Sequence, residues 1–479
     1  MEYLDFELRI GAGTAQSYPV TVVRSPVGET SATIQLPLDD PVFRKHLQAV
    51  EQVRSAVAQT RGVGDTDRQL RLAGTQVADE LDTAEAIGRA LFTALLPAKV
   101  LTCYRRSCDA AHAAGKRLRL RLRIEAPELA VLPWEFLFDE DEGDYISLNQ
   151  DTPLTRYLEL DRPQTALTIP PPIRILGMVA SPRDLAALDV AQEQQRMAAA
   201  IDHLVESRTV ELTWLPGQTL QALDTALRDS GHEWHIFHFI GHGGFDAQRG
   251  EGLLALVDER DGNQHLFPAR NLGRLFARHP SIRLIVLNAC EGARASETNL
   301  FSSVGAVLAE RGVPAVVSMQ YEITDLAALE FSRNFYDALA RGLPVDAAVT
   351  EARYYISMKL ADSSEWGTPV LYMRAPDGNL FTVDIATAIF RGQTPPEVRP
   401  APPVPPAAQP AAQTHADTAP PPPANETERG LQILLRKVKQ FWIEGVLEKS
   451  LFQKVLIDLG MERMQGAVDN PWASTLGRK

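Results

Sequence analysis

The sequence is poor in cysteine. Only Cys103, Cys108 and Cys290 occur in a chain of 479 residues. Such a small and odd number excludes the disulfide framework that holds many small secreted domains together. We therefore expect a reducing compartment, in which a functional thiol stays active.

Long apolar segments are also missing. Residues Met1 to Asp5 contain neither the basic segment nor the apolar segment of a signal peptide. No uninterrupted apolar stretch reaches the length of about 20 residues that a membrane-spanning helix needs. These two absences predict a cytoplasmic protein without a membrane partner.

Positive charge is in deficit. The chain carries 48 Lys and Arg against 61 Asp and Glu, which gives a formal net charge of −13. This balance argues against nucleic acid as a default partner. The hydrophobic share of 45% and the charged share of 23% are those of an ordinary globular protein, and the length predicts two or three domains.

An apolar run from Ile282 to Leu287 predicts the central strand. Almost every residue in it is apolar, Arg283 being the exception, and such a short run is typical of a strand that is covered on both faces of a mostly parallel sheet. The run gives way to Asn288 and then to Cys290. Ligands in open α/β sheets bind beyond the carboxyl ends of strands. We therefore expect the Cys290 thiol to lie in a crevice at the end of this strand.

A second apolar run, His235 to Ile240, leads to the glycine-flanked His242, 48 positions before Cys290. If the two strands are neighbours, imidazole and thiol meet at one sheet edge. The imidazole can then take the thiol proton or pair with the thiolate. Gly243 and Gly244 let the main chain approach a substrate. The amides of Gly243 and Cys290 are candidates for an oxyanion hole.

These motifs carry a family resemblance. Residues 288–292, Asn-Ala-Cys-Glu-Gly, resemble the caspase signature Gln-Ala-Cys-x-Gly, whose histidine lies about fifty residues upstream, with Asn288 in place of the glutamine. Residues 238–243 together with 287–290 resemble a CHAT domain, the caspase- and separase-like cysteine peptidase family. The resemblance covers about residues 100 to 385. It also includes Leu132 to Leu137, Thr152 to Tyr157, Phe335-Tyr336 and a helix beginning near Pro344.

The resemblance implies a caspase-like α/β fold and a cysteine endopeptidase that uses His242 and Cys290 on a protein or peptide substrate. Strand and helix patterns do alternate from about residue 173, which predicts a mostly parallel sheet with helices on both faces. Residues 1 to 37 predict an antiparallel meander, and residues 40 to 115 predict helices.

Apolar residues then alternate with arginines from Arg117 to Arg123. We interpret this segment as a strand with one face in water. An arginine face that binds an acidic partner is the alternative.

Composition divides the chain into four parts. Residues 1–115 form an N-terminal strand and helical region, and residues 116–390 form the CHAT-like domain. Residues 394–424 are dense in proline and alanine, which predicts an extended linker. Residues 425–479 resemble a small helical module found beside effector domains in bacterial signalling proteins. We expect this module to bind an upstream sensor or another partner protein.

Several histidines between residues 232 and 242 raise the alternative of a metal site. His235 and His238 fall on opposite faces of a strand and cannot converge on one ion. No cysteine or carboxylate cluster completes a ligand set, so we expect neither a metal nor a cofactor. His238 is expected to be a buried, hydrogen-bonded residue beneath the site, with Asn288 and Gly292 as structural neighbours.

Three carboxylates follow the expected strand ends: Asp246, Glu322 and Asp325. A carboxylate at the base of an S1 pocket would select a basic P1 side chain, although Asp325 also suits a helix N-cap.

Two functions are open. One is a caspase-like peptidase that acts as a regulated effector in bacterial signalling or defence. The other is a catalytically silent scaffold that acts through the C-terminal module. The presence of both His242 and Cys290 favours the peptidase.

Overall fold

The computed structural model of the chain describes residues 2–13, 17–58, 77–158, 165–229, 231, 233–246, 248, 251–289 and 300–383. Residues Met1–Arg399 form one compact unit. The expected linker, residues 394–424, and the expected helical module, residues 425–479, lie outside the described residues.

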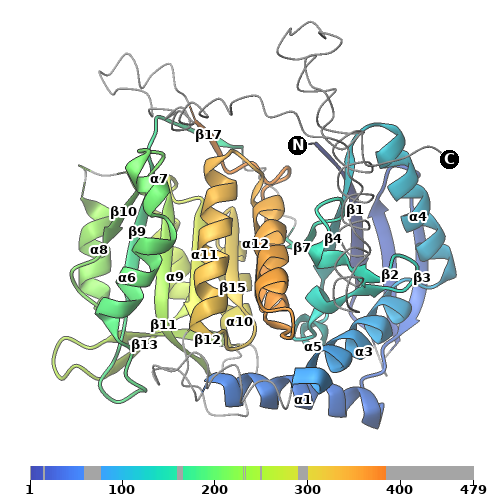
Figure 1. Ribbon diagram of the computed structural model, residues 1–479, viewed down its shortest axis with the longest axis horizontal. Helices are drawn as coiled ribbons and strands as arrows, with labels where there is room; N and C mark the ends of the chain where they lie inside the picture. Colours follow the sequence, from blue (N-terminus) through green and yellow to red (C-terminus); the bar gives the residue numbers. More distant parts are fainter. Residues whose placement is uncertain are drawn as a thin grey trace, which may run out of the picture. The chain divides into compact units, whose positions relative to one another are not determined.

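A large mixed sheet runs through the described part of the chain. Its strand order is β10-β9-β11-β14-β15-β16-β7-β4-β1-β2-β3, and β12 and β13 extend it beyond β11 (Figure 1). The strands of this sheet are β1 (Tyr3–Ile10), β2 (Ser17–Arg24), β3 (Thr30–Gln35), β4 (Arg117–Ile124), β7 (Leu154–Tyr157), β9 (Ile173–Val179), β10 (Val210–Trp214), β11 (Ile236–Asp246), β12 (Glu251–Val257), β13 (Gln264–Pro268), β14 (Leu284–Ala289), β15 (Ala315–Met319) and β16 (Pro369–Met373).

Most neighbours in this sheet run parallel. In the sheet order, β10, β9, β11, β14 and β15 run parallel to one another. The next four strands, β16, β7, β4 and β1, also run parallel to one another. The antiparallel pairs are β15 with β16, the two pairs of the N-terminal meander, and the two pairs of the extension. The predicted α/β class and the predicted meander of the first three strands are confirmed. The meander joins the main sheet because β1 pairs with β4.

Helices cover both faces of the sheet. Figure 1 shows α6, α11 and α12 in front of it. On one face Tyr336 of α11 bonds to His238 of β11, and on the other Phe276 of α9 packs on Phe237 of the same strand. The helices are α1 (Pro41–Ala58), α3 (Val77–Leu95), α4 (Ala98–Ala113), α5 (Pro127–Ala130), α6 (Val190–Ala200), α7 (Asp202–Glu206), α8 (Leu220–Arg228), α9 (Ala269–Phe276), α10 (Leu300–Glu310), α11 (Asp325–Ala340) and α12 (Val345–Lys359).

Several helix boundaries follow from local sequence. The side chain of Thr219 accepts a hydrogen bond from the amide of Ala222 and so caps α8, and Thr324 caps α11 in the same way. Gly312, with φ of +119°, follows the end of α10, where a residue with a side chain would be strained. Among the described residues, no single helix has the length and hydropathy of a membrane span; α3 and α4, taken together as a pair bent by 100°, meet that test.

The arginine strand β4 corrects the sequence interpretation. Arg119 and Arg121 are buried, not exposed to water. The parallel register of β1 and β4 sets Asp5 beside Arg119 and Glu7 beside Arg121. Arg119 donates to Asp5 at 2.7 Å and to Asp346, a residue of α12, at 3.0 Å. A wet strand face and an external acidic partner were therefore both wrong, because the acidic groups belong to the chain itself.

The end of β11 also differs from the expectation. The strand was predicted to stop at His242, but it continues to Asp246 and pairs antiparallel with β12 there. Gly243 and Gly244 lie within this pairing, and neither has a positive φ. Glycine permits a sharp turn but does not impose one, so a partner strand decided the outcome.

Candidate functional site

The site is built on two neighbouring parallel strands, β11 and β14. Their register sets Ile240 beside Asn288 and Gly241 beside Ala289. Because side chains alternate along a strand, His238 and His242 lie on the same face as Asn288. All three residues are buried, and only 3% of the surface of His242 is exposed. The expectation that the two motif strands are neighbours is confirmed.

His242 has a defined hydrogen bond to the main chain. Its Nε2 lies 2.8 Å from the carbonyl oxygen of Ala186, in the segment between β9 and α6. A carbonyl oxygen only accepts, so Nε2 carries the hydrogen. In the neutral ring the lone pair is then on Nδ1, which is the nitrogen that can act as a base. Ala186 thus sets both the tautomer and the orientation of the imidazole.

The segment that supplies this carbonyl is itself anchored on both sides of Ala186. Before it, the amide of Ser181 donates to Gln218 at 2.8 Å. After it, the amide of Leu188 donates back to the Ser181 hydroxyl at 3.0 Å. Asp184 accepts from the amide of Gln264 on β13 at 2.7 Å. These bonds hold the Ala186 carbonyl in place against His242.

His238 lies four residues before His242, on the same face of β11. Its Nδ1 is 2.7 Å from the hydroxyl of Tyr336 on α11. Burial lowers the pKa of His238 to about 4, so the ring is neutral at pH 7. The expectation of a buried, hydrogen-bonded histidine is confirmed. Its partner Tyr336 was not identified as functional from the sequence, which offered only the resemblance over Phe335-Tyr336.

Cys290 and Gly292 lie outside the described residues. The described chain reaches Ala289, which is beside Gly241 in the sheet. The next residue after Gly241 is His242, and the next after Ala289 is Cys290. Gly243 lies on β11 in register with Leu254 of β12. The assignment of the Gly243 and Cys290 amides to an oxyanion hole stays a prediction.

The three candidate S1 carboxylates come from two places. Asp246 ends β11, beyond His242, and its Oδ1 accepts from the amide of Gln248. Glu322 is half-buried in the turn between β15 and α11. Asp325 is the first residue of α11 and forms an ion pair with Arg196 of α6 at 2.7 Å. Thr324, not Asp325, caps this helix. The S1 role of the three carboxylates stays a prediction.

A buried ion pair links two of the segments that carried the family resemblance. Arg156 on β7 donates to Glu135 at 2.7 Å and to the carbonyl oxygen of Leu132. Gln320, which directly follows β15, donates to Glu135 at 2.9 Å. The pair thereby holds the start of the turn that contains Glu322. The sequence signalled these residues only as parts of matching segments, and their role as a support was missed.

No group of three or more His, Cys, Asp or Glu side chains that could bind a metal occurs in the described part of the chain. His235, another histidine in this strand region, has a structural partner. Its Nδ1 accepts from the amide of Arg174 at 2.9 Å. Burial, assisted by the charge of Arg174, lowers the pKa of His235 to about 4.

Comparisons with known proteins address the family. The chain is similar to a chain of the Saccharomyces cerevisiae separase–securin complex in two crystal structures, with 11% and 12% identity and TM-scores of 0.45 and 0.44. These matches cover 78% and 77% of this chain but only 30% of that chain. The Drosophila initiator caspase Dronc matches with 10% identity and a TM-score of 0.29, over 47% of this chain and 93% of that chain.

No curated protein sequence matches the chain at a significant level. The model of the CHAT domain family matches residues 82–395, which is well over half of the 479 residues. The protein therefore belongs to the CHAT domain family.

Proposed function

We propose that the protein is a caspase-like cysteine endopeptidase that cleaves a protein or peptide substrate with His242 and Cys290. The observation that carries this proposal is the register of β11 and β14. It sets Gly241 beside Ala289, and the residues that follow these two in the sequence are His242 and Cys290. A base and a nucleophile that each follow directly after a pair of neighbouring residues on parallel strands fit the pairing that acyl transfer requires.

The chemistry follows from the tautomer of His242. Its Nδ1 takes the proton of the Cys290 thiol, and the thiolate attacks the scissile carbonyl carbon. The amides of Gly243 and Cys290 would stabilise the oxyanion. The intermediate collapses to a thioester as the amine leaves with the proton from His242. Water, deprotonated by His242, then hydrolyses the thioester and restores the thiol. The Ala186 carbonyl, bound to Nε2, stabilises the imidazolium that forms between these steps.

The test is cleavage of a mixed peptide library by the purified protein. Cys290→Ala and His242→Ala should each lower kcat/KM by about 1000-fold or more, because members of such a unit depend on one another. His112→Ala, which changes an exposed histidine at the end of α4, is the matched control and should retain activity. Substantial cleavage by either dyad variant would refute the assignment.

The same library reports the specificity. We propose a basic P1 residue, selected by one of Asp246, Glu322 and Asp325. A preference for an acidic or apolar P1 residue would contradict this proposal.

A catalytically silent scaffold is the alternative function. A thiol-reactive peptide probe distinguishes the two, because an active peptidase is labelled at Cys290 and Cys290→Ala is not.

We also propose that residues 425–479 recruit an upstream sensor or partner protein, as in a regulated effector of bacterial signalling or defence. The linker composition and the apolar residues of the tail support this proposal. Because residues 1–399 form one compact unit, residues 400–479 can be deleted without cutting into it. We expect unchanged cleavage of a small peptide and loss of partner-dependent activation. Loss of basal cleavage would contradict a separate module.

A further inference from the structure

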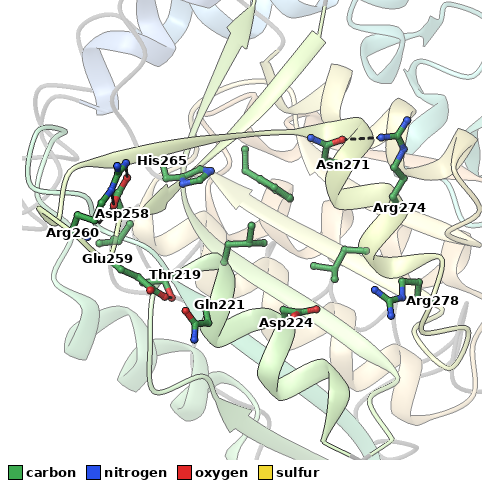
Figure 2. A pocket seen from close by; sticks show the side chains of 14 residues that line it. Thr219, Gln221, Asp224, Asp258, Glu259, Arg260, His265, Asn271, Arg274 and Arg278 are labelled. Atoms are coloured by element: carbon green, nitrogen blue, oxygen red, sulfur yellow. Dashed lines mark hydrogen bonds and ion pairs between the residues drawn. The ribbon is translucent and has the colours of Figure 1, made fainter.

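A groove of about 690 Å³ lies outside the candidate active site (Figure 2). Its walls are α8, the β12–β13 pair and α9. Its apolar lining consists of half-buried side chains: Leu220, Val257, Phe267 and Leu275. A cavity of this size that combines an apolar surface with a few charged groups has the properties of a binding site.

The charged residues divide between the two ends of the groove. Figure 2 shows Asp258, Glu259 and Arg260 at one end and Arg274 and Arg278 at the other. At the first end the charges are compensated in part, because Arg260 pairs with Asp258 at 2.8 Å and Glu259 accepts from Thr219.

The other end is different. Within the described residues, the side chain of Arg274 donates a single, long hydrogen bond of 3.4 Å, to the neutral side chain of Asn271. Neither Arg274 nor Arg278 forms an ion pair with a carboxylate of the described chain. The nearby Asp224 is occupied by Arg228 at 2.6 Å. In a chain with a net charge of −13, two uncompensated arginines at the end of an apolar groove are complementary to an acidic group.

The strand beside the groove favours an extended ligand. Among the described strands, β13 pairs only with β12, and on its other edge the amide of Gln264 at the start of the strand bonds to Asp184, which leaves the edge from His265 onward without a partner strand. An open edge is where an extended peptide lies alongside a sheet and places alternate side chains into neighbouring hollows. Leu266, in the middle of β13, is 44% exposed.

We propose that this groove binds an extended peptide segment of a partner protein. The segment carries acidic side chains, which pair with Arg274 and Arg278, next to apolar side chains, which cover Phe267 and Leu275. Val257 at the groove lies two residues along β12 from Ala255, which is the partner of His242 in the sheet. A protein held in the groove is therefore brought close to the strand that carries His242. The binding itself does not depend on the proposed peptidase activity.

The experiment uses the full-length protein and an array of ten-residue peptides that combine acidic, basic and apolar positions. The strongest peptides are then measured by fluorescence polarisation. We expect peptides with acidic residues beside leucine or phenylalanine to bind best. Arg274→Glu with Arg278→Glu should weaken their binding at least tenfold. Lys99→Glu with Arg106→Glu makes the same charge change on the exposed face of α4 and should have no such effect.

Two further arms keep the outcome decisive. Arg274→Gln with Arg278→Gln replaces the charge-reversed variant if the latter does not fold, and it should also weaken binding. Polyphosphate and vesicles of anionic lipid serve as other anionic probes. The proposal is overturned if acidic peptides are not preferred over basic ones, if both variants bind them as well as the wild type does, or if the two arginines bind polyphosphate or vesicles and no peptide.

Discussion

Two strands of the same sheet, β4 and β11, bury titratable side chains in opposite ways. On β4, the charged side chains of Arg119 and Arg121 are buried beside the carboxylates of Asp5, Glu7 and Asp346, at 2.7 to 4.0 Å. On β11, no carboxylate of the described residues offsets the burial of His238, and this burial lowers its pKa to about 4. The buried charges of β4 are balanced by carboxylates of β1 and α12, whereas the histidine of β11 is neutral.

The difference shows what a buried polar side chain requires. An ion taken out of water loses several kcal/mol of hydration, which only well-placed opposite charges recover. A histidine avoids this cost by giving up its proton. The candidate base His242 is also buried, and its Nε2 bonds to the neutral carbonyl of Ala186. A neutral imidazole is the form that can accept a proton from a thiol.

The largest effect that tests this comparison is expected on β4. Arg119→Met leaves Asp346, whose side chain is fully buried, and Asp5 without their main counter-charge. We expect the free energy of unfolding to fall by about 3–5 kcal/mol. Urea denaturation measures this change. Arg123→Met, on the same strand but paired with Glu125 near the surface, is the control and should cost less than about 1 kcal/mol. Equal, small losses in both variants would mean that water reaches Arg119.

An intermediate effect is expected from pH. The pKa of His235 and of His238 is about 4 in the folded chain and 6.5 when unperturbed. Between pH 6.5 and 4 the unfolded chain therefore binds more protons than the folded chain. Stability falls as the pH drops through this window, by about 1.4 kcal/mol per pH unit and histidine, and neither group changes it above the window.

His235→Asn isolates one of these two contributions. Asparagine keeps an acceptor for the amide of Arg174 and cannot be protonated in this range. We expect the slope of unfolding free energy against pH to become flatter between pH 6 and 4.5. His112→Ala, at an exposed position, should leave the slope unchanged. A slope in His235→Asn equal to that of the wild type would show that His235 is protonated in the folded state.

Much of this comparison was predictable for β11 and almost none of it for β4. An apolar run such as the one around His238 predicts a strand that is covered on both faces, and the structure confirms this prediction. The alternation of arginine with leucine on β4 is the same for a wet face and for a face covered by acidic groups. The carboxylates that decide between them, Asp5 and Asp346, are distant in sequence. Register between strands is a tertiary property, so local pattern does not contain it.

The candidate site divides in the same way. The neighbouring strands and the buried state of His238 followed from the order of the apolar runs. The Ala186 carbonyl did not, because a main-chain group leaves no mark in the sequence. The continuation of β11 past His242 was missed because the partner strand β12, not the glycines, determines where β11 ends.

The smallest effect is expected at the bond between Tyr336 and His238. Tyr336→Phe removes a hydroxyl 2.7 Å from Nδ1 and leaves a buried polar atom without its partner. The ring itself still fills its place between α11 and the sheet, so we expect a loss of about 1–2 kcal/mol, well below that of Arg119→Met. Urea denaturation at pH 7, where His238 is neutral, measures this hydrogen bond without a contribution from protonation.

A double-variant cycle separates the hydrogen bond from packing. His238→Leu alone leaves the Tyr336 hydroxyl buried without its partner, whereas His238→Leu with Tyr336→Phe leaves no polar atom at the contact. If neutral hydrogen bonding is what holds β11 to α11, the double variant should cost less than the sum of the two single variants. Additive losses would mean that the two side chains act only by filling space. In that case β11 would differ from β4 only in that its buried histidine is neutral whereas the buried arginines of β4 are charged.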